Sequence, residues 1–245
     1  GVEALKIGST SAAMGDVDGD GDLDIYVANY GEISVLRSGG SVSVRTINGK
    51  PVVTGKYSNR IRIMNDEMVE VGEPDFLYLN DGSGNFTKID WTNGNWLDEN
   101  GQPIRKEFWD LGLSAMIRDV NQDGRPDIYV CNDFQTPNRF WINQGGGKFQ
   151  LIDELAMRHC SYFAMAVDFA DINRDGHDDF FVADMMSPTH MLEMMQIVVT
   201  NPFAKPIDEF IDRPIIHRNT LLVNRGDNSY MDTANFSGVA ATEWT

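Results

Sequence analysis

The sequence predicts an all-β protein built from β-propeller blades of four antiparallel strands. Three observations lead to this fold class: an acidic nine-residue string that occurs three times, a β-branched and aromatic run after each copy, and a later pair of such runs joined by a glycine-rich turn. Each unit reads as strand, acidic loop, strand, connection, strand, hairpin, strand. Repeated four-stranded units are typical of propeller blades, which bury their faces against neighbouring blades.

The first strand of each unit is predicted from small residues and methionine at 12–14, 114–116 and 164–166. The acidic strings follow, with the pattern D-x-[DN]-x-D-G-x-x-D, starting at Asp16 and at two later aspartates. Oxygens at positions 1, 3, 5, 7 and 9 can surround a hard cation that prefers six to eight oxygen ligands, and glycine at position 6 permits the sharp turn. One copy alone would also suit a solvated acidic turn, but three copies favour about three Ca²⁺ sites.

The second strand of each unit follows its loop directly. An EF-hand begins with the same spacing but needs glutamate at position 12, which here is Val27, Val130 and Val182. The runs at 25–27, 128–130 and 180–182 are β-branched and aromatic, so each loop is expected to lead into a strand and not a helix.

The third and fourth strands are predicted from 76–86, 139–149 and 220–230, where an apolar run ends in asparagine and a glycine-rich turn precedes an aromatic residue. We expect one partial propeller domain over residues 1–245. Its repeats cover about 9–90, 111–153 and 162–233, and 234–245 would start a further repeat with a lead-in strand. Three repeats do not close a ring of about four to eight blades, so the ring is expected to be incomplete.

Two segments lengthen the first and third repeats. The insertion at 37–75 alternates Val and Ile around an Asn48-Gly49 turn, which predicts an extra hairpin. The insertion at 185–218 contains Ser187-Pro188, which suits a helix start, and one short helix is expected from there to Asn201-Pro202.

The composition of the chain argues against some classes of binding partner. The net charge of -17 argues against nucleic acid and anionic membranes, and no apolar run reaches the length of a membrane span. Open acidic loops fill more readily at extracellular Ca²⁺ levels, so we expect an extracellular or periplasmic location. Clustered carboxylates should also couple Ca²⁺ binding to stability.

Other motifs have ordinary interpretations beside functional ones. Arg225-Gly-Asp227 spells an adhesion tripeptide but falls at a predicted hairpin turn. The methionines at 185–195 with His190 suit either a Cu(I) site or, for Met191, Met194 and Met195, the apolar face of a helix packed on the propeller or on a partner.

Cysteine and carboxylate residues give no clear reactive site. Cys131 and Cys160 are either core thiols or a bond between neighbouring blades. No catalytic constellation is apparent, although Asp168 and Glu193 could serve acid/base chemistry.

The loops, their strands and the N-x-G-x-G-x-F hairpins resemble the FG-GAP/VCBS repeat family, whose integrin α-chain members form Ca²⁺-bearing propellers. Residues 110–133 look like the bacterial branch related to cartilage acidic protein 1, whose members can carry an ASPIC/UnbV domain. Asn replaces Asp at position 3 of the second and third loops, so the first site is expected to bind Ca²⁺ most tightly. The metal ligands implied by this resemblance are Asp16, Asp18, Asp20, Asp22 (carbonyl), Asp24, Asp119, Asn121, Asp123, Arg125 (carbonyl), Asp127, Asp171, Asn173, Asp175, His177 (carbonyl) and Asp179.

The function expected from these features is that of an exported Ca²⁺-binding interaction or adhesion module. Its partner would be a protein or an extracellular glycan, contacted through the insertions at 37–75 and 185–218. One alternative is a carbohydrate-active enzyme, a polysaccharide lyase or hydrolase, on a propeller scaffold. Another is an accessory subunit of a larger surface complex.

Overall fold

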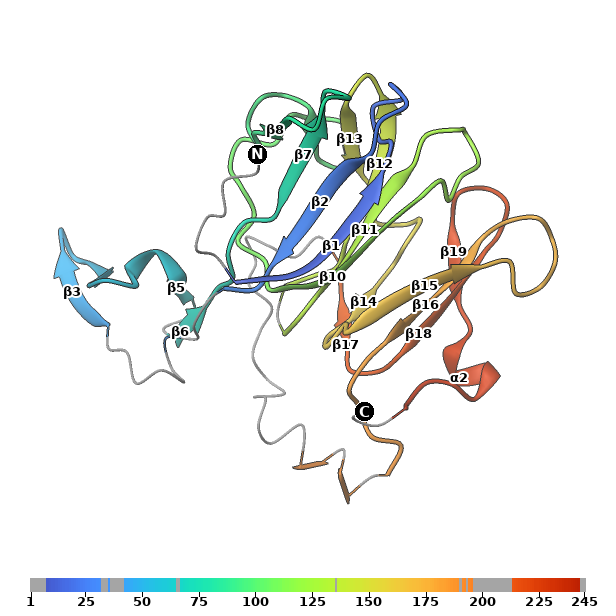
Figure 1. Cartoon of the computed structure of the whole chain (residues 1–245). Coiled ribbons are helices and arrows are strands. Elements are labelled where there is room, and N and C mark those ends of the chain that lie inside the picture. The colour runs from blue at the N-terminus through green and yellow to red at the C-terminus, as the bar shows by residue number, and fades with distance from the viewer. Residues whose placement is uncertain are drawn as a thin grey trace.

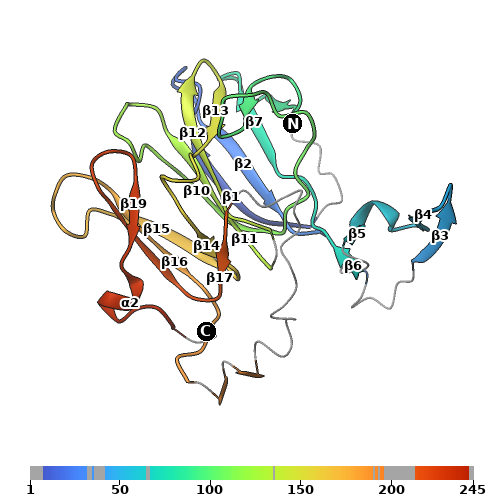
Figure 2. The same ribbon diagram turned by 180° about the vertical axis from the view of Figure 1, so that it is seen from behind.

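The computed structural model describes residues 8–31, 35, 42–64, 67–134, 136–189, 191–192, 194–195 and 213–242. Three antiparallel sheets stand next to one another as blades 1, 2 and 3 (Figures 1 and 2). Blade 1 has the order β1 (Ser9–Gly15), β2 (Asp24–Asn29), β7 (Phe76–Asn80), β8 (Phe86–Ile89). Blade 2 has the order β10 (Gly112–Arg118), β11 (Asp127–Asn132), β12 (Arg139–Gly145), β13 (Lys148–Leu151). Blade 3 has the order β15 (Ala166–Ala170), β16 (Asp179–Ala183), β18 (Thr220–Asn224), β19 (Tyr230–Asp232).

These four-stranded antiparallel sheets, with little helix and no closed barrel in the described part of the chain, agree with the predicted all-β fold of an incomplete propeller. The strands after the acidic strings and the three glycine-rich hairpins are confirmed. One strand that joins a blade was not predicted. Strand β9 (Trp96–Leu97), from the connection between blades 1 and 2, pairs parallel with the edge strand β13.

The middle blade is buried on both faces. Every residue of β11 is buried, because alternate side chains of a strand point to opposite sides of its sheet. Tyr129 and Cys131 pack in the core shared with blade 3, whereas Ile128 and Val130 pack in the core shared with blade 1. The blades therefore bury apolar area chiefly against one another, as the propeller interpretation requires.

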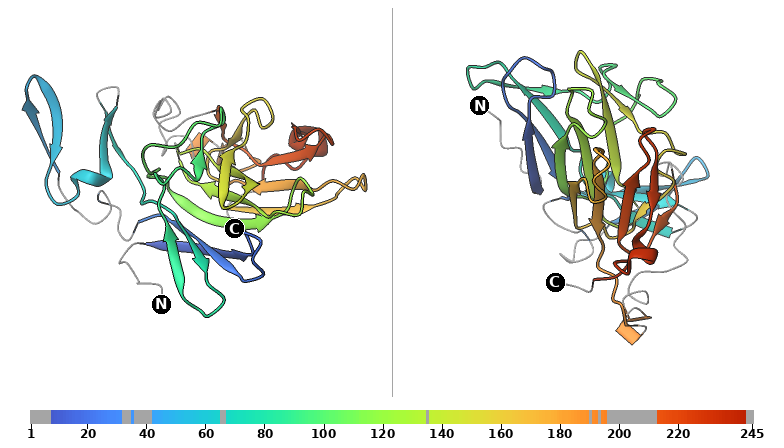
Figure 3. Two further views of the ribbon diagram at one scale, coloured as in Figure 1. Left: turned by 90° about the horizontal axis from the view of Figure 1, so that it is seen from above. Right: turned by 90° about the vertical axis from the view of Figure 1, so that its right-hand side faces the viewer.

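The first insertion forms two hairpins. Strands β3 (Ser43–Ile47) and β4 (Lys50–Thr54) meet at Asn48 and Gly49, whose φ angles of 52° and 76° suit a two-residue hairpin turn. This confirms the predicted hairpin, which stands away from the blades (Figure 3, left, light blue). A short 3-10 helix η1 (Ser58–Arg60) and a second hairpin, β5 (Ile61–Met64) with β6 (Glu67–Glu70), follow without a sequence prediction.

The second insertion is described only in part. Residues 191–192 and 194–195 are helical, but 187–189 form no helix, so the predicted helix start at Ser187-Pro188 is wrong. The other residues of the predicted helix, 193 and 196–202, lie outside the described residues, as does His190. Met191 is 73% exposed, and Met194 and Met195 are also exposed, so the prediction that they pack on the propeller is wrong. No described element covers this turn of helix, and the alternative of packing on a partner remains a prediction.

The end of the described chain differs from the predicted lead-in strand. A one-turn helix, α2 (Ala234–Ser237), is followed by 238–242, which form no strand, so that prediction is wrong for these residues. Asn219 holds this stretch instead: its N–H donates to the Ala240 carbonyl and its Nδ2 donates to the Val239 carbonyl. A strand needs a ladder partner, and these bonds supply only a loop anchor.

A last pair of short strands joins the connection between blades 2 and 3 to the last part of the second insertion. β14 (Cys160–Ser161) pairs parallel with β17 (Ile215–Ile216). Among the described residues, no helix combines the length and the apolar character that crossing a bilayer requires.

Candidate metal sites

The three acidic strings adopt the same loop. In the first loop, the Asp16 carboxylate accepts bonds from the N–H groups of Gly19 (2.8 Å) and Gly21 (3.0 Å). In the other loops the position-1 aspartate binds the N–H groups of positions 5 and 6. These pairs are Asp119 with Asp123 (3.0 Å) and Gly124 (2.9 Å), and Asp171 with Asp175 (3.1 Å) and Gly176 (3.0 Å).

Each loop needs a left-handed residue at position 4 as well as at position 6. Position 6 is always glycine, and Gly21 has a φ of 95°. Position 4 is Gly19 in the first loop but Gln122 (φ 60°) and Arg174 (φ 64°) in the others. Sequence reasoning identified only position 6, because a single glycine at position 4 is no repeated signal.

The aspartate at position 9 is buried and bridges the loop to the hairpin of its own blade. In blade 1, Asp24 accepts from the N–H of Val17 (2.9 Å) and of Asn80 (2.9 Å). Asp127 does the same with Val120 (3.1 Å) and Asn143 (2.8 Å), and Asp179 with Ile172 (3.1 Å) and Asn224 (2.9 Å). Burial raises the pKa of Asp24, and that of Asp127 to about 7. Position 9 therefore supports the loop structure in addition to its predicted ligand role.

The asparagine at or near the end of the third strand of each blade is a positioning residue, a role that the repeated pattern in the sequence did not indicate. Its Nδ2 donates to the carbonyl of loop position 8, and its Oδ1 accepts from the glycine N–H of the hairpin. The donor–acceptor pairs are Asn80 to Leu23 (3.3 Å), Asn143 to Pro126 (2.9 Å) and Asn224 to Asp178 (3.3 Å). The glycines are Gly82, Gly145 and Gly226.

In the first loop, carboxylates converge. One oxygen each from Asp16, Asp18 and Asp24 lies within 4.8 Å of the others. Burial, followed by the nearby Asp24 charge, raises the pKa of Asp18. Three hard anionic donors that share one small space fit a hard divalent cation, which would relieve their mutual repulsion.

In the second and third loops, the side chains of positions 3 and 5 bind each other. Asn121 Nδ2 donates to Asp123 (3.1 Å), and Asn173 Nδ2 donates to Asp175 (2.8 Å). Asp123 also forms an ion pair with Arg125. The His177 N–H and Asn173 bonds lower the pKa of Asp175. Within the described residues, only the first loop gathers three acidic groups in this way, so its side chains fit a cation best.

The predicted ligands outside this group remain predictions. Asp20 and Asp22 are joined by a bond from the Asp22 N–H to the Asp20 carboxylate (3.0 Å). The carbonyl roles of Asp22, Arg125 and His177 also stay predictions.

The loops are neighbours at one end of the blades. The Gln122 side chain of the second loop donates to the Gly176 carbonyl of the third. Asn143 Nδ2 in blade 2 donates to the Val17 carbonyl of the first loop at 2.7 Å. A cavity of about 190 Å³ between the first two loops has Asp16 and Arg125 in its walls. The first and second loops are therefore each tied to the blade that follows.

The other sequence candidates are placed as follows. Cys131 and Cys160 are buried thiols without a disulfide, and burial raises the pKa of Cys131 to about 12. The tripeptide at 225–227 lies in the β18–β19 turn, where Asp227 accepts from the Ser229 N–H (3.0 Å), so the turn interpretation holds. Asp168 is exposed on β15, and Glu193 lies outside the described residues.

Stacked four-stranded sheets with acidic loops at one end define a segment of a repeat protein of the propeller class. Residues 119–182, from the second loop through most of β16, match the FG-GAP-like repeat family. Residues 9–44, which include β1, the first loop and β2, match the FG-GAP repeat family. The two matches support the FG-GAP repeat family, and neither points to a bacterial branch. No curated protein matches the chain.

Proposed function

We propose that this chain is part of an exported Ca²⁺-binding propeller that acts as an interaction or adhesion module, with Ca²⁺ in a structural role. The observation that carries the proposal is the convergence of Asp16, Asp18 and Asp24 in a loop that is tied to the neighbouring blade. Repulsion among these carboxylates opposes folding until a cation neutralises them, so Ca²⁺ binding adds to the stability of the blade stack. Loops of this openness favour an extracellular or periplasmic setting.

Partner contact is proposed for the insertions. In the 37–75 insertion, Val44 and Ile47 of β3 and Val52 of β4 are exposed apolar residues on a two-stranded hairpin. A hairpin with open edges and exposed apolar side chains suits pairing with a protein partner. Met191 and Met194 of the 185–218 insertion supply a second exposed apolar surface.

The enzyme alternative has less support. Asp90 and Glu107 line one cavity together with Arg62, which is a set of groups that a glycosidase could use. However, bonds from the Thr92 side chain and N–H lower the pKa of Asp90, whereas a general acid needs a raised pKa. The cavity is better suited to binding than to proton transfer.

Calorimetric Ca²⁺ titration of EDTA-stripped protein tests the proposal, with thermal melting followed in parallel. We expect about three sites, the tightest in the first loop, and a higher melting temperature with Ca²⁺. Asp18→Asn copies the residue that the other two loops carry, so it keeps a native loop chemistry and should weaken the tightest site about tenfold. Asn121→Asp is the matched gain-of-charge variant and should strengthen a weaker site. Absence of Ca²⁺ binding would refute the metal role.

A further inference from the structure

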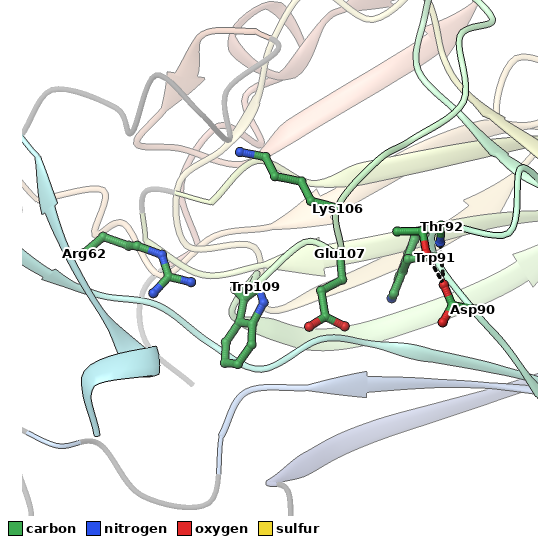
Figure 4. A pocket seen from close by; sticks show the side chains of 7 residues that line it. All are labelled: Arg62, Asp90, Trp91, Thr92, Lys106, Glu107 and Trp109. Carbon is green, nitrogen blue, oxygen red and sulfur yellow. Dashed lines mark hydrogen bonds between the residues drawn. The ribbon is translucent and has the colours of Figure 1, made fainter. Parts of the chain in front are cut away.

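A second cavity lies at the end of the blades opposite to the acidic loops (Figure 4). Strand β8 starts at the hairpin next to the first loop and runs away from it, so the residues that follow β8 lie at the far end. The cavity has a volume of about 530 Å³, and small-molecule sites typically occupy about 300–1,000 Å³. Its size is therefore that of a ligand site.

Two indoles form the apolar part of its wall. Trp91 is buried and packs against Trp96 at 4.3 Å between ring centroids, and its Nε1 donates to the Asp75 carbonyl at 2.9 Å. Trp109 packs with Val71, and its carbonyl accepts from the Gly72 N–H at 3.1 Å. The Trp91 ring is therefore fixed by packing and by its own hydrogen bond, and the Trp109 backbone is fixed at Gly72, which reduces the entropy lost when a ligand binds.

The polar part of the wall balances donors with acceptors. Arg62 and Lys106 are basic, Asp90 and Glu107 are acidic, and Thr92 contributes a hydroxyl. Figure 4 shows Glu107 beside Trp109, with Arg62 on the other side of the indole. The Arg62 guanidinium carbon lies 5.5 Å from the Trp109 ring centroid. The formal charges of these side chains cancel, so the lining favours neither an anion nor a cation.

We propose that this cavity binds a neutral glycan through a pyranose ring. A pyranose offers an apolar C–H face that can pack on indole, and its hydroxyls both donate to carboxylates and accept from guanidinium and ammonium groups. The net charge of -17 disfavours an acidic glycan. This inference rests on the proposed interaction function and names the ligand class of one site.

The first insertion completes the site. Arg62 belongs to β5 of that insertion, whereas the other polar wall residues come from the connection between blades 1 and 2. The insertion is therefore assigned a part in glycan binding that is separate from the exposed β3–β4 hairpin.

Calorimetry of the full chain in Ca²⁺-containing buffer tests this site. The probes are cellohexaose, mannohexaose, xylohexaose and maltohexaose, with oligogalacturonate as the acidic comparison. We expect at least one neutral hexaose to bind. Glu107→Gln, at an exposed position, and Arg62→Ala should each weaken that binding about tenfold, the effect of losing one hydrogen bond to a charged group. Trp109→Phe keeps an aromatic wall and should weaken it less.

Arg45→Ala is the matched control, because Arg45 lies in the same insertion on the exposed strand β3 and should leave binding unchanged. No binding by the four neutral hexaoses, preference for oligogalacturonate, or equal effects of Arg62→Ala and Arg45→Ala would overturn the inference. Asp18→Asn separates the two proposals. If this variant loses Ca²⁺ affinity but still binds the hexaose, the glycan site is independent of the first metal loop. If the protein binds Ca²⁺ but no hexaose, only the glycan proposal is refuted.

Discussion

The Asn143 side chain donates a 2.7 Å hydrogen bond to the carbonyl of Val17, which lies 126 residues earlier in the chain. The same Nδ2 donates at 2.9 Å to the Pro126 carbonyl of the second loop. One buried amide group therefore joins the acidic loops of blades 1 and 2. Asn80 and Asn224 bind the corresponding carbonyl within their own blades.

We expect Asn143→Ala to destabilise the protein by about 1–3 kcal/mol, because it leaves the Val17 carbonyl, which is buried, and the Pro126 carbonyl, which is half-buried, without this donor. It should also weaken Ca²⁺ binding in the first loop, which loses an anchor. Asn224→Ala is the matched control and should affect only the third loop. Chemical denaturation and Ca²⁺ calorimetry measure both effects, and equal changes in first-loop affinity would contradict the cross-blade role.

Arg139 and Asp110 form a buried ion pair, with bonds of 2.8 and 3.1 Å and side chains that are 4% and 5% exposed. Arg139→Met should destabilise the protein by about 3–5 kcal/mol, because it leaves the Asp110 charge buried. Arg118→Met removes an ion pair with Asp178 whose arginine is 47% exposed, and should cost at most about 1 kcal/mol. Urea denaturation of both variants compares them. Similar losses of stability in the two variants would show that burial does not determine how much each ion pair contributes.

The buried carboxyl group of Asp75 is expected to make the stability of the protein depend on pH. Burial raises its pKa from 3.8 to about 8, although Asn29 N–H (2.7 Å) and Tyr26 Oη–H (2.9 Å) donate to it. Between pH 3.8 and about pH 8, Asp75 therefore keeps its proton in the folded protein but has lost it in the unfolded chain. The free energy of unfolding should therefore fall as the pH rises, by up to about 1.4 kcal/mol per pH unit.

Asp75→Asn removes this titration, so its denaturation midpoint should vary less with pH between 4 and 8 than that of the unmodified chain. Melting curves at several pH values provide the measurement. Parallel pH profiles for the two proteins would mean that Asp75 is ionised in the folded state.

Gly72 lies where the first insertion meets the connection before β10. A Cβ there would stand 1.6 Å from the Asp110 carbonyl oxygen, so Gly72→Ala forces the backbones apart and should cost about 1–3 kcal/mol. Because Trp109 binds Gly72, tryptophan fluorescence should change as well. Gly49→Ala, in an open hairpin turn, is the control and should leave the fluorescence unchanged. Unchanged fluorescence for Gly72→Ala would argue against this attachment.

The local chemistry of the sequence was sufficient to predict the blade strands, the three acidic loops and the Asn48-Gly49 hairpin. Strand alternation and left-handed glycine are properties of neighbouring residues, so a single sequence displays them. The convergence of Asp16, Asp18 and Asp24 also follows from spacing within one loop. Spacing alone does not predict that Asn121 pairs with Asp123 or Asn173 with Asp175. An amide at position 3 can bind either a cation or the neighbouring side chain at position 5.

The sequence by itself determined the repeated all-β units and their acidic loops, because these depend on turn chemistry and periodicity over a few residues. Only the tertiary structure decided that Asn143 reaches Val17, that Arg139 pairs with Asp110, and that Arg62 meets Trp91 and Trp109 at one cavity. It also decided that Met191 is exposed and that 238–242 form no strand. The physical reason is that such contacts depend on which faces and ends of distant strands pack together, and packing is a property of the whole fold.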